Sequence, residues 1–433
     1  MTRWNNASPG RDCFTCMSLL FYTRGYWGKI RSMESDSWKR NLFLIAISEF
    51  IALLGFSLFN PFMPLYMQQL GNFSSREAAF WSGIAVGGSG LAMFLSSPIW
   101  GIIADRWGRK PMLLRAQFGG AVVVSLFIIA PNIYLFVFFR TLQGLFTGTV
   151  TAAAALVATI TPRSRLPYSM GILMGAVFGG MTLGPLVGGF LADTLGFQLT
   201  FLITSLLLLV GGSIVLVLVK ENFKKPDPLP ASPLKSMLKL AASRDVFPLL
   251  LVIASLNIGP QIISPILPLV IGEISRTGTA ASASGMAMAL LGIVTALSSV
   301  VIGRFTRRVS VRRILIICCI GTGLLYIPPI FARNEVQIIL LIGLTGLLNG
   351  GIMTASNSLV GLAVPISQQG LAYGLSQSAN SFGSGLGPFV GGGLAPVIGL
   401  RPVFGVTAGI FVLVGTLAMK LIPESATAGG KRE

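Results

Sequence analysis

The sequence predicts an all-α membrane protein whose twelve transmembrane helices form two pseudo-symmetric six-helix halves. Composition is the first indication. Hydrophobic residues make up 53% of the 433 residues and charged residues only 11%, against about 25% charged residues in an ordinary soluble domain. A series of long apolar stretches is the second indication, and an internal repeat of glycine and proline landmarks is the third.

Each apolar stretch is long enough to cross a membrane. About 20 residues at 1.5 Å per residue cover roughly 30 Å of hydrocarbon. Backbone groups in lipid must find partners within their own segment, so these stretches are expected to be helices. In chain order the expected helices are 42–68, 78–100, 113–131, 133–158, 168–191, 197–219, 246–272, 281–302, 313–332, 336–362, 371–395 and 402–422.

Positive charge orients the bundle. Lys and Arg gather on the cytoplasmic side of membrane proteins, and 27 of the 32 Lys and Arg residues fall on the side of the N-terminus. Both termini are therefore expected in the cytoplasm. The formal net charge of +18 is then explained by the cytoplasmic placement of Lys and Arg, which also attracts this face to lipid head groups. We therefore expect no nucleic-acid partner. The exceptions are Arg140, within a span, and Arg76, Arg276, Arg333 and Arg401, on the outer side.

The chain repeats itself at an offset of about 203 residues. Four landmarks at a nearly constant spacing indicate two related six-helix halves. The paired landmarks are Pro61 and Pro64 with Pro265 and Pro268, Gly101 with Gly303, Gly144 and Gly148 with Gly346 and Gly350, and LGPLVGG at 183–189 with LGPFVGG at 386–392.

The repeat divides the chain into regions. The N-terminal half covers 41–219 and the C-terminal half 246–422. A basic, Pro-rich linker at 220–245 joins them on the cytoplasmic side, and residues 423–433 form a tail. Residues 1–40 are basic and have no clear A-x-A cleavage site, so we expect an unstructured extension or a start of translation at Met33.

Several classes of protein are excluded by what the sequence lacks. There is no histidine, so a Ser-His-Asp triad and an H-E-x-x-H zinc site cannot form. No phosphate-binding loop of the G-x-x-x-x-G-K-[ST] type occurs. Cys13 and Cys16 have no second pair of ligands, and Cys318 and Cys319 are adjacent in an expected helix. We therefore expect no enzyme activity, metal, disulfide or cofactor, and an energy source in an ion gradient or in the substrate's own gradient.

A charged segment with the sequence GIIADRWGRK, residues 101–110, separates two apolar runs. It resembles the loop between helices 2 and 3 of the major facilitator superfamily, G-x-L-A-D-R-x-G-R-K. The resemblance implies a secondary transporter in which this loop gates the cytoplasmic side. The gating residues implied are Gly101, Asp105, Arg106, Gly108, Arg109 and Lys110.

A second basic segment, at 303–313, departs from this pattern. Arg307 stands where the first half has Asp105, and Ser310 where it has Gly108. We therefore expect the acidic gate to operate mainly from the N-terminal half, with Asp105 docked against the N-terminus of helix 11.

Helix 5 carries the sequence GGMTLGPLVGG at 179–189. One interpretation is helix packing alone, because small residues four apart let backbones approach closely. The pattern also resembles the motif of the antiporter branches of the superfamily, especially twelve-helix drug/proton exporters. The motif residues are Gly180, Gly184, Pro185, Gly188 and Gly189.

Two charged residues lie within spans, where ionisable groups are expensive and point to function. Arg140, in the sequence RTLQG, corresponds by family likeness to a helix-4 arginine linked to proton transfer. The alternative is an arginine whose charge reaches an interface. Glu49 could bind protons, attract a cationic drug, or make a structural hydrogen bond or a pair with Arg140. We assign proton coupling to Glu49 and Arg140, together with Asp105 at the gate.

The predicted function is proton-coupled efflux of amphipathic drugs or toxic small molecules by a monomer in the bacterial cytoplasmic membrane. An importer or facilitator of a sugar or organic acid is the alternative. A membrane sensor that transports nothing is a remote one, since the sequence shows no appended soluble domain. Candidate cavity residues are Phe56, Asn60, Gln143, Met174, Phe178, Asn257, Gln261, Asn349, Asn357, Gln377 and Asn380.

Overall fold

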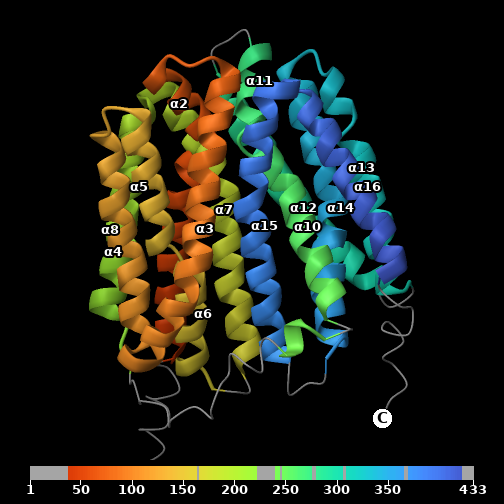
Figure 1. The fold of residues 1–433 in the computed structure, drawn as a ribbon. Helices are drawn as coiled ribbons and strands as arrows, with labels where there is room; N and C mark the ends of the chain where they lie inside the picture. The colour runs from red at the N-terminus through yellow and green to blue at the C-terminus, as the bar shows by residue number, and fades with distance from the viewer. Residues whose placement is uncertain are drawn as a thin grey trace, which may run out of the picture.

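The computed structural model is a bundle of long helices running between two faces, with the first half of the chain on one side and the second half on the other (Figure 1). All regular elements in the part that it describes are helices. The described residues are 38–162, 165–221, 239–243, 246–275, 279–305, 309–364 and 369–421.

The first half opens with a helix over 38–59, so Trp38 to Arg40 belong to the first helix and not to the predicted extension 1–40. The remaining elements of this half are η1 (Asn60–Phe62), α2 (Met63–Gly71), α3 (Ser75–Trp107), α4 (Arg109–Ile128), α5 (Ile133–Phe146), α6 (Thr149–Ile160), α7 (Leu166–Leu195) and α8 (Phe197–Leu218).

The second half has the same order of spans, but its fourth span, α14, is a single unbroken helix. Its elements are α10 (Phe247–Ile263), α11 (Leu267–Ile274), α12 (Ala280–Phe305), α13 (Val311–Leu325), η3 (Pro328–Phe331), α14 (Glu335–Leu362), α15 (Gln369–Ile398) and α16 (Pro402–Leu421).

Eleven helical segments among the described residues are long and apolar enough to cross a membrane. α15 is the twelfth helix of the bundle and packs against α3 (Figure 1). It is not one of these eleven because serine, glutamine, asparagine and glycine fill much of its sequence. The expected twelve-helix fold is confirmed, and α15 lies at the seam between the halves.

Prolines interrupt the first helix of each half at matching places. A proline removes a backbone donor and clashes with the preceding turn. In the first half the helix over 38–59 passes through η1 into α2, with Pro61 and Pro64 at the junction. In the second half α10 ends at Ile263 and α11 begins at Leu267, beside Pro268. Each was expected as one continuous helix, and each has a short outer segment set off by its prolines.

The helix-5 glycines pack against the first helix of their own half. A methyl group on Gly180 would lie 2.6 Å from the carbonyl oxygen of Phe50, and one on Gly184 would lie 2.8 Å from that of Leu54. The second half repeats the arrangement, with Gly383 in α15 against Ala254 and Gly387 against Ile258 of α10. Both copies of the motif therefore pack two helices closely at their glycines.

The two halves meet along two seams, α3 with α15 and α7 with α12. A methyl group on Gly90 would lie 2.6 Å from the Cα atom of Gly385, so the backbones of α3 and α15 almost touch. At the outer end of the other seam Asp193 of α7 accepts a hydrogen bond from the backbone N–H of Ser282 in α12 at 2.7 Å. The outer side is thus closed by backbone packing and by one carboxylate contact.

Candidate functional site

A buried arginine forms the polar centre of the first half. Arg140, in α5, is only 7% exposed. Its guanidinium group donates one hydrogen bond to the side-chain oxygen of Asn60 at 2.7 Å and another to the side-chain oxygen of Gln143. It also lies 5.6 Å from the ring centroid of Phe59. The structure thus brings together three residues that the sequence singled out, and it holds the arginine inside the bundle rather than at an interface.

This group keeps unused hydrogen-bonding capacity. The Nε atom of Arg140 and the side-chain nitrogen of Gln143 are buried without a hydrogen-bond partner among the described residues. Most buried polar groups in proteins are paired. The two donors therefore mark a place where water, a proton carrier or a polar part of a substrate can bind.

Glu49 lies fully inside the first half, with no exposed surface. Its Oε1 accepts a hydrogen bond from Gln117 of α4 at 3.5 Å, and its carboxyl group interacts with the side chain of Thr149. Ser48 beside it bridges Gln117 and the carbonyl oxygen of Gly211 in α8. The acid is therefore enclosed by three other helices of its own half and does not line an open cavity.

The two intramembrane charges lie at different depths. Arg140 contacts Asn60, at the outer end of the first helix, whereas Glu49 contacts Thr149, near the middle of the fourth. Glu49 and Asn60 are eleven residues apart along the first helix, about 16 Å of helix axis at 1.5 Å per residue. A proton moving between Glu49 and Arg140 would need intermediate carriers, so the direct pairing that the sequence left open is not the arrangement found.

The fourth span is broken between these two levels. α5 ends at Phe146 and α6 begins at Thr149, and between them Gly148 has φ +110°, a conformation that favours glycine. The break frees carbonyl groups, and two side chains bind them. Trp100 donates its indole N–H to Leu145 at 2.7 Å, and Arg115 donates to Thr147 at 3.3 Å. Continuous helix was expected over 133–158, and this break is a correction to it.

Trp100 and Arg115 also contact each other. The guanidinium carbon of Arg115 lies 3.7 Å from the centroid of the Trp100 ring, in a cation–π arrangement. Neither was among the predicted site residues. Their signal in the sequence was weak, because a tryptophan and an arginine beside a basic loop are usual at a membrane interface.

The charged segment at 101–110 is mostly helical rather than a loop. α3 continues to Trp107 and α4 starts at Arg109, so Gly108 alone makes the turn, with φ +99°. A helix satisfies its own backbone groups, which lets α3 carry charged residues out of the membrane without unwinding. The backbone of Gly101, Asp105 and Arg106 lies in α3, but their side chains are outside the described part.

The start of α4 is held by the end of α8. Glu221 accepts hydrogen bonds from the backbone N–H groups of Arg109 at 2.9 Å and Lys110 at 2.8 Å. In return the Lys110 ammonium donates to the carbonyl oxygens of Leu216 and Val219 at the C-terminus of α8. Each charge thus faces the helix end of opposite partial charge. Arg109 also reaches the carbonyl oxygen of Ala155 in α6, at 3.2 Å.

In the second half, two predicted cavity residues form an amide pair. The side-chain nitrogen of Asn257 in α10 donates to the side-chain oxygen of Asn380 in α15 at 2.5 Å. Nearby on α15, Phe382 faces Phe94 of α3, with ring centroids 6.2 Å apart, and both rings are partly exposed. This aromatic pair joins the two halves and was not predicted, because only tertiary packing brings α3 and α15 together.

The other predicted cavity residues are scattered. Phe56 packs in the apolar core of the first half, beside Gly120, because it faces α4 and α8. Met174 packs against a second core cluster of that half. Asn349 hydrogen-bonds Tyr326 inside the second half. Exposed or half-exposed side chains are those of Phe178, Gln261, Asn357 and Gln377.

Comparison with known proteins agrees with this architecture. A profile of the Major Facilitator Superfamily matches residues 45–275 and again 249–432. The chain belongs to the major facilitator superfamily. The two matched stretches overlap and together span nearly the whole described chain, and this protein is a secondary transporter of the cytoplasmic membrane.

Curated relatives cover most of the transporter. It is 34% identical over 394 residues to the multidrug resistance protein MdtG of Klebsiella pneumoniae (strain 342), which covers 89% of this chain and 94% of the relative. It is 34% identical over 379 residues to MdtG of Salmonella arizonae, covering 86% and 93% respectively.

Solved structures show the same fold at low sequence identity. The nucleoside transporter NupG matches with a TM-score of 0.75 at 14% identity, over 88% of this chain and all of that one. The D-xylose-proton symporter matches with a TM-score of 0.70 at 15% identity, over 90% and 99%. At these identities the likeness establishes the fold and leaves the substrate open.

Proposed function

We propose that this secondary transporter exports amphipathic drugs or toxic small molecules in exchange for protons. The observation that carries the proposal is its identity of about one third with the MdtG multidrug resistance proteins over nearly their whole length. The alternative, import of a sugar or organic acid, has no comparable support, because the structural matches to such carriers share only the fold.

The partly exposed groups at the seam favour apolar cargo. Phe94 and Phe382 offer aromatic surface from opposite halves, and the Asn257–Asn380 amide pair offers a few polar groups beside it. Apolar contacts tolerate varied shapes, whereas a sugar site needs several placed hydrogen-bond partners. An amphipathic molecule held between the two pairs is the substrate class that this arrangement suits.

Proton coupling is assigned to Glu49 and Arg140 in separate steps. Glu49 is an enclosed acid whose second carboxylate oxygen has no hydrogen-bond partner among the described residues, so that oxygen can hold a proton. Arg140 holds Asn60 at the outer end of the first helix. Protonation of Glu49 changes its contacts with Gln117 and Thr149, which lie on two different helices. We expect that change to shift the equilibrium between the inward-open and outward-open arrangements of the helices that line the cavity.

Transport in inverted membrane vesicles tests the proposal. With the vesicle interior acidified, the protein should accumulate amphipathic dyes or antibiotics, and a protonophore should abolish the accumulation. Vesicles without the protein are the control. If purified protein in liposomes instead carries a sugar or organic acid inward with protons, and ignores every dye and antibiotic tested, the export proposal is wrong and the importer alternative holds.

A further inference from the structure

The break in the fourth span occurs in one half of the transporter and not in the other. Gly148 and Gly350 are paired glycines of the repeat, but of the two only Gly148, with φ +110°, interrupts a helix. Gly350 lies inside α14, which runs unbroken from Glu335 to Leu362. A glycine at this position is therefore not sufficient to break the span, and another feature of the first half must keep it broken.

Two side chains distinguish the first half at this level. Trp100 of α3 and Arg115 of α4 bind carbonyl groups at the break and stack on each other. We call these two residues the clasp. At the separation of 202 residues that relates the two glycines, the second half has Ile302 and Ile317. Neither isoleucine has a side-chain donor, so the half without a clasp is the half without a break.

The clasp binds carbonyl groups that a continuous helix would use itself. In an α-helix the carbonyl group of residue i accepts from the N–H group of residue i+4. The carbonyl of Leu145 would thus accept from Thr149, and that of Thr147 from Thr151. The clasp occupies these two carbonyl oxygens instead, at 2.7 and 3.3 Å. Side-chain donors satisfy the carbonyls without closing the helix, as backbone groups at membrane depth require.

The break determines where the first residue of α6 lies. α6 begins at Thr149, which is buried and whose side chain interacts with the carboxyl group of Glu49. The same acid accepts from Gln117, two residues after Arg115 in α4. α6 and α8, which also enclose Glu49, carry no ionisable side chain. The charged groups at membrane depth on the neighbouring helices are Arg115 of α4 and, further out, Arg140 of α5.

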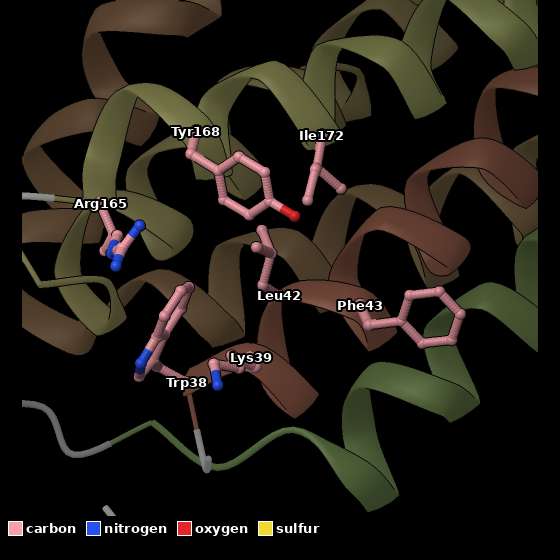
Figure 2. A pocket seen from close by; sticks show the side chains of 7 residues that line it. All are labelled: Trp38, Lys39, Leu42, Phe43, Arg165, Tyr168 and Ile172. Carbon is pink, nitrogen blue, oxygen red and sulfur yellow. The ribbon is translucent and has the colours of Figure 1, made fainter. Parts of the chain in front are cut away.

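An apolar cluster separates Glu49 from a cytoplasmic cavity of about 590 Å³ between the first helix and α7. Figure 2 shows two of its lining residues, Leu42 and Ile172, beside the ring of Tyr168. Both pack into the cluster that contains Leu156 of α6. Glu49 lies seven residues beyond Leu42 on the first helix, about 10 Å along its axis. The contacts of the acid therefore depend on how α6 is packed and not on this cavity.

We propose that the clasp positions Thr149 against Glu49 for the proton step of transport, by keeping the fourth span broken. The proposal rests on the proposed role of Glu49 in proton coupling. The two clasp residues stand on α3 and α4, the helices that flank the Gly108 turn. A movement of the gating segment therefore reaches Glu49 through the two clasp hydrogen bonds and the first residue of α6.

Two assays on the purified full-length protein in liposomes separate this role from a general loss of structure. Accumulation of ethidium driven by a pH gradient needs the proton step, whereas exchange of radiolabelled for unlabelled ethidium at equal pH needs only that the helices alternate. Trp100→Ile/Arg115→Ile gives the first half the side chains of the second, so this clasp variant should fold. Its accumulation should fall about fivefold, the effect of losing one hydrogen bond of ordinary strength, and its ethidium exchange should stay within about twofold of the parent. Thr149→Val should show the same split.

Hydrogen exchange followed by mass spectrometry reports the break directly. In the clasp variant the released carbonyls should pair with the amides of Thr149 and Thr151, so hydrogen exchange at these amides should become slower than in the parent. Ser205→Ala is the matched control, because it removes a buried bond from α8 to the carbonyl oxygen of Ala121 in α4, at 2.9 Å. It should change neither these amides nor the ratio of ethidium accumulation to ethidium exchange.

The outcomes distinguish this inference from the proposed function. If the parent accumulates no ethidium, or if Glu49→Gln accumulates it like the parent, the proton role of Glu49 fails and the inference falls with it. If Glu49→Gln loses accumulation but the clasp variant keeps it, or loses ethidium exchange to the same degree, only the positioning role is overturned. Unchanged or faster hydrogen exchange at the amides of Thr149 and Thr151 would overturn it as well.

Discussion

Glu221 accepts the backbone N–H of Lys110 at 2.8 Å, while the ammonium group of the same lysine donates to Val219, two residues before that glutamate. The end of the sixth span and the start of the third are therefore joined by two charges, each at the helix end that it stabilises. The contact lies directly beside the Gly108 turn of the gating segment. This contact holds the α4 side of that turn in place.

Removing the Glu221 carboxylate should loosen this turn. We expect Glu221→Ala to lower stability by about 1–2 kcal/mol, the range for losing a charged helix cap, and to raise protease sensitivity near Gly108. Thermal unfolding in detergent measures the first effect and limited proteolysis the second. Glu273→Gln, which changes an exposed acid on α11, should change neither, and an equal effect there would argue against the capping role.

The helix-5 glycines allow a direct test of packing. Gly184→Ala places a methyl group 2.8 Å from the carbonyl oxygen of Leu54, so helix α7 must move away from the first helix. Overpacking of this kind costs about 1–3 kcal/mol, and we expect lower transport. Gly175→Ala, in the same helix, meets nothing within 4 Å and should be as stable as the parent or slightly more so. Equal behaviour of the two variants would refute the packing argument.

Neutralising Glu49 should separate binding from coupling. In Glu49→Gln the amide keeps an oxygen for Gln117 but cannot exchange a proton in the working pH range. Binding of neutral substrates should be preserved, whereas efflux driven by a pH gradient should fall at least tenfold. Substrate-induced proton release, followed with a pH indicator in detergent, should disappear. Unchanged efflux and unchanged proton release would remove Glu49 from the mechanism.

Asp193 should hold the outer side shut. Its carboxylate accepts from the backbone of Ser282 across the α7–α12 seam at 2.7 Å. Because this contact is exposed, we assign it only about 1 kcal/mol, or a fivefold change in the ratio of states. Asp193→Asn should therefore increase the outward-open population. Distances between spin labels on the outer ends of α7 and α12 would lengthen, and identical distance distributions in variant and parent would contradict the prediction.

Asp105 is predicted to act in the opposite direction. If its carboxylate stabilises the N-terminus of α15 when the cytoplasmic side closes, Asp105→Asn should destabilise that closed state by up to about 1.4 kcal/mol. The ratio of inward-open to outward-open states should then rise about tenfold. Labels at the cytoplasmic ends of α3 and α15 should move apart, while membrane insertion stays normal. A shift toward outward-open states would show that the acid has another role.

The fold could be predicted because its causes are local in the sequence. Long apolar stretches must be helices in lipid, and the two proline pairs and two GP motifs mark the repeat without reference to any distant contact. The same locality explains where the prediction was wrong. Hydropathy does not report the break at Gly148, since the residues around it carry no charge, and it ended the second helix at 100 although α3 continues to Trp107.

The sequence by itself determined which residues are unusual: an acid and an arginine within spans, glycines four apart, and amides in apolar helices. Only the tertiary structure decided what each one contacts. It placed Glu49 beside Thr149 and Arg140 beside Asn60 at different depths, paired Asn257 with Asn380, and brought Phe94 to Phe382. The physical reason is that burial in lipid constrains each helix separately, whereas these contacts depend on how helices far apart in the chain are rotated and packed against one another.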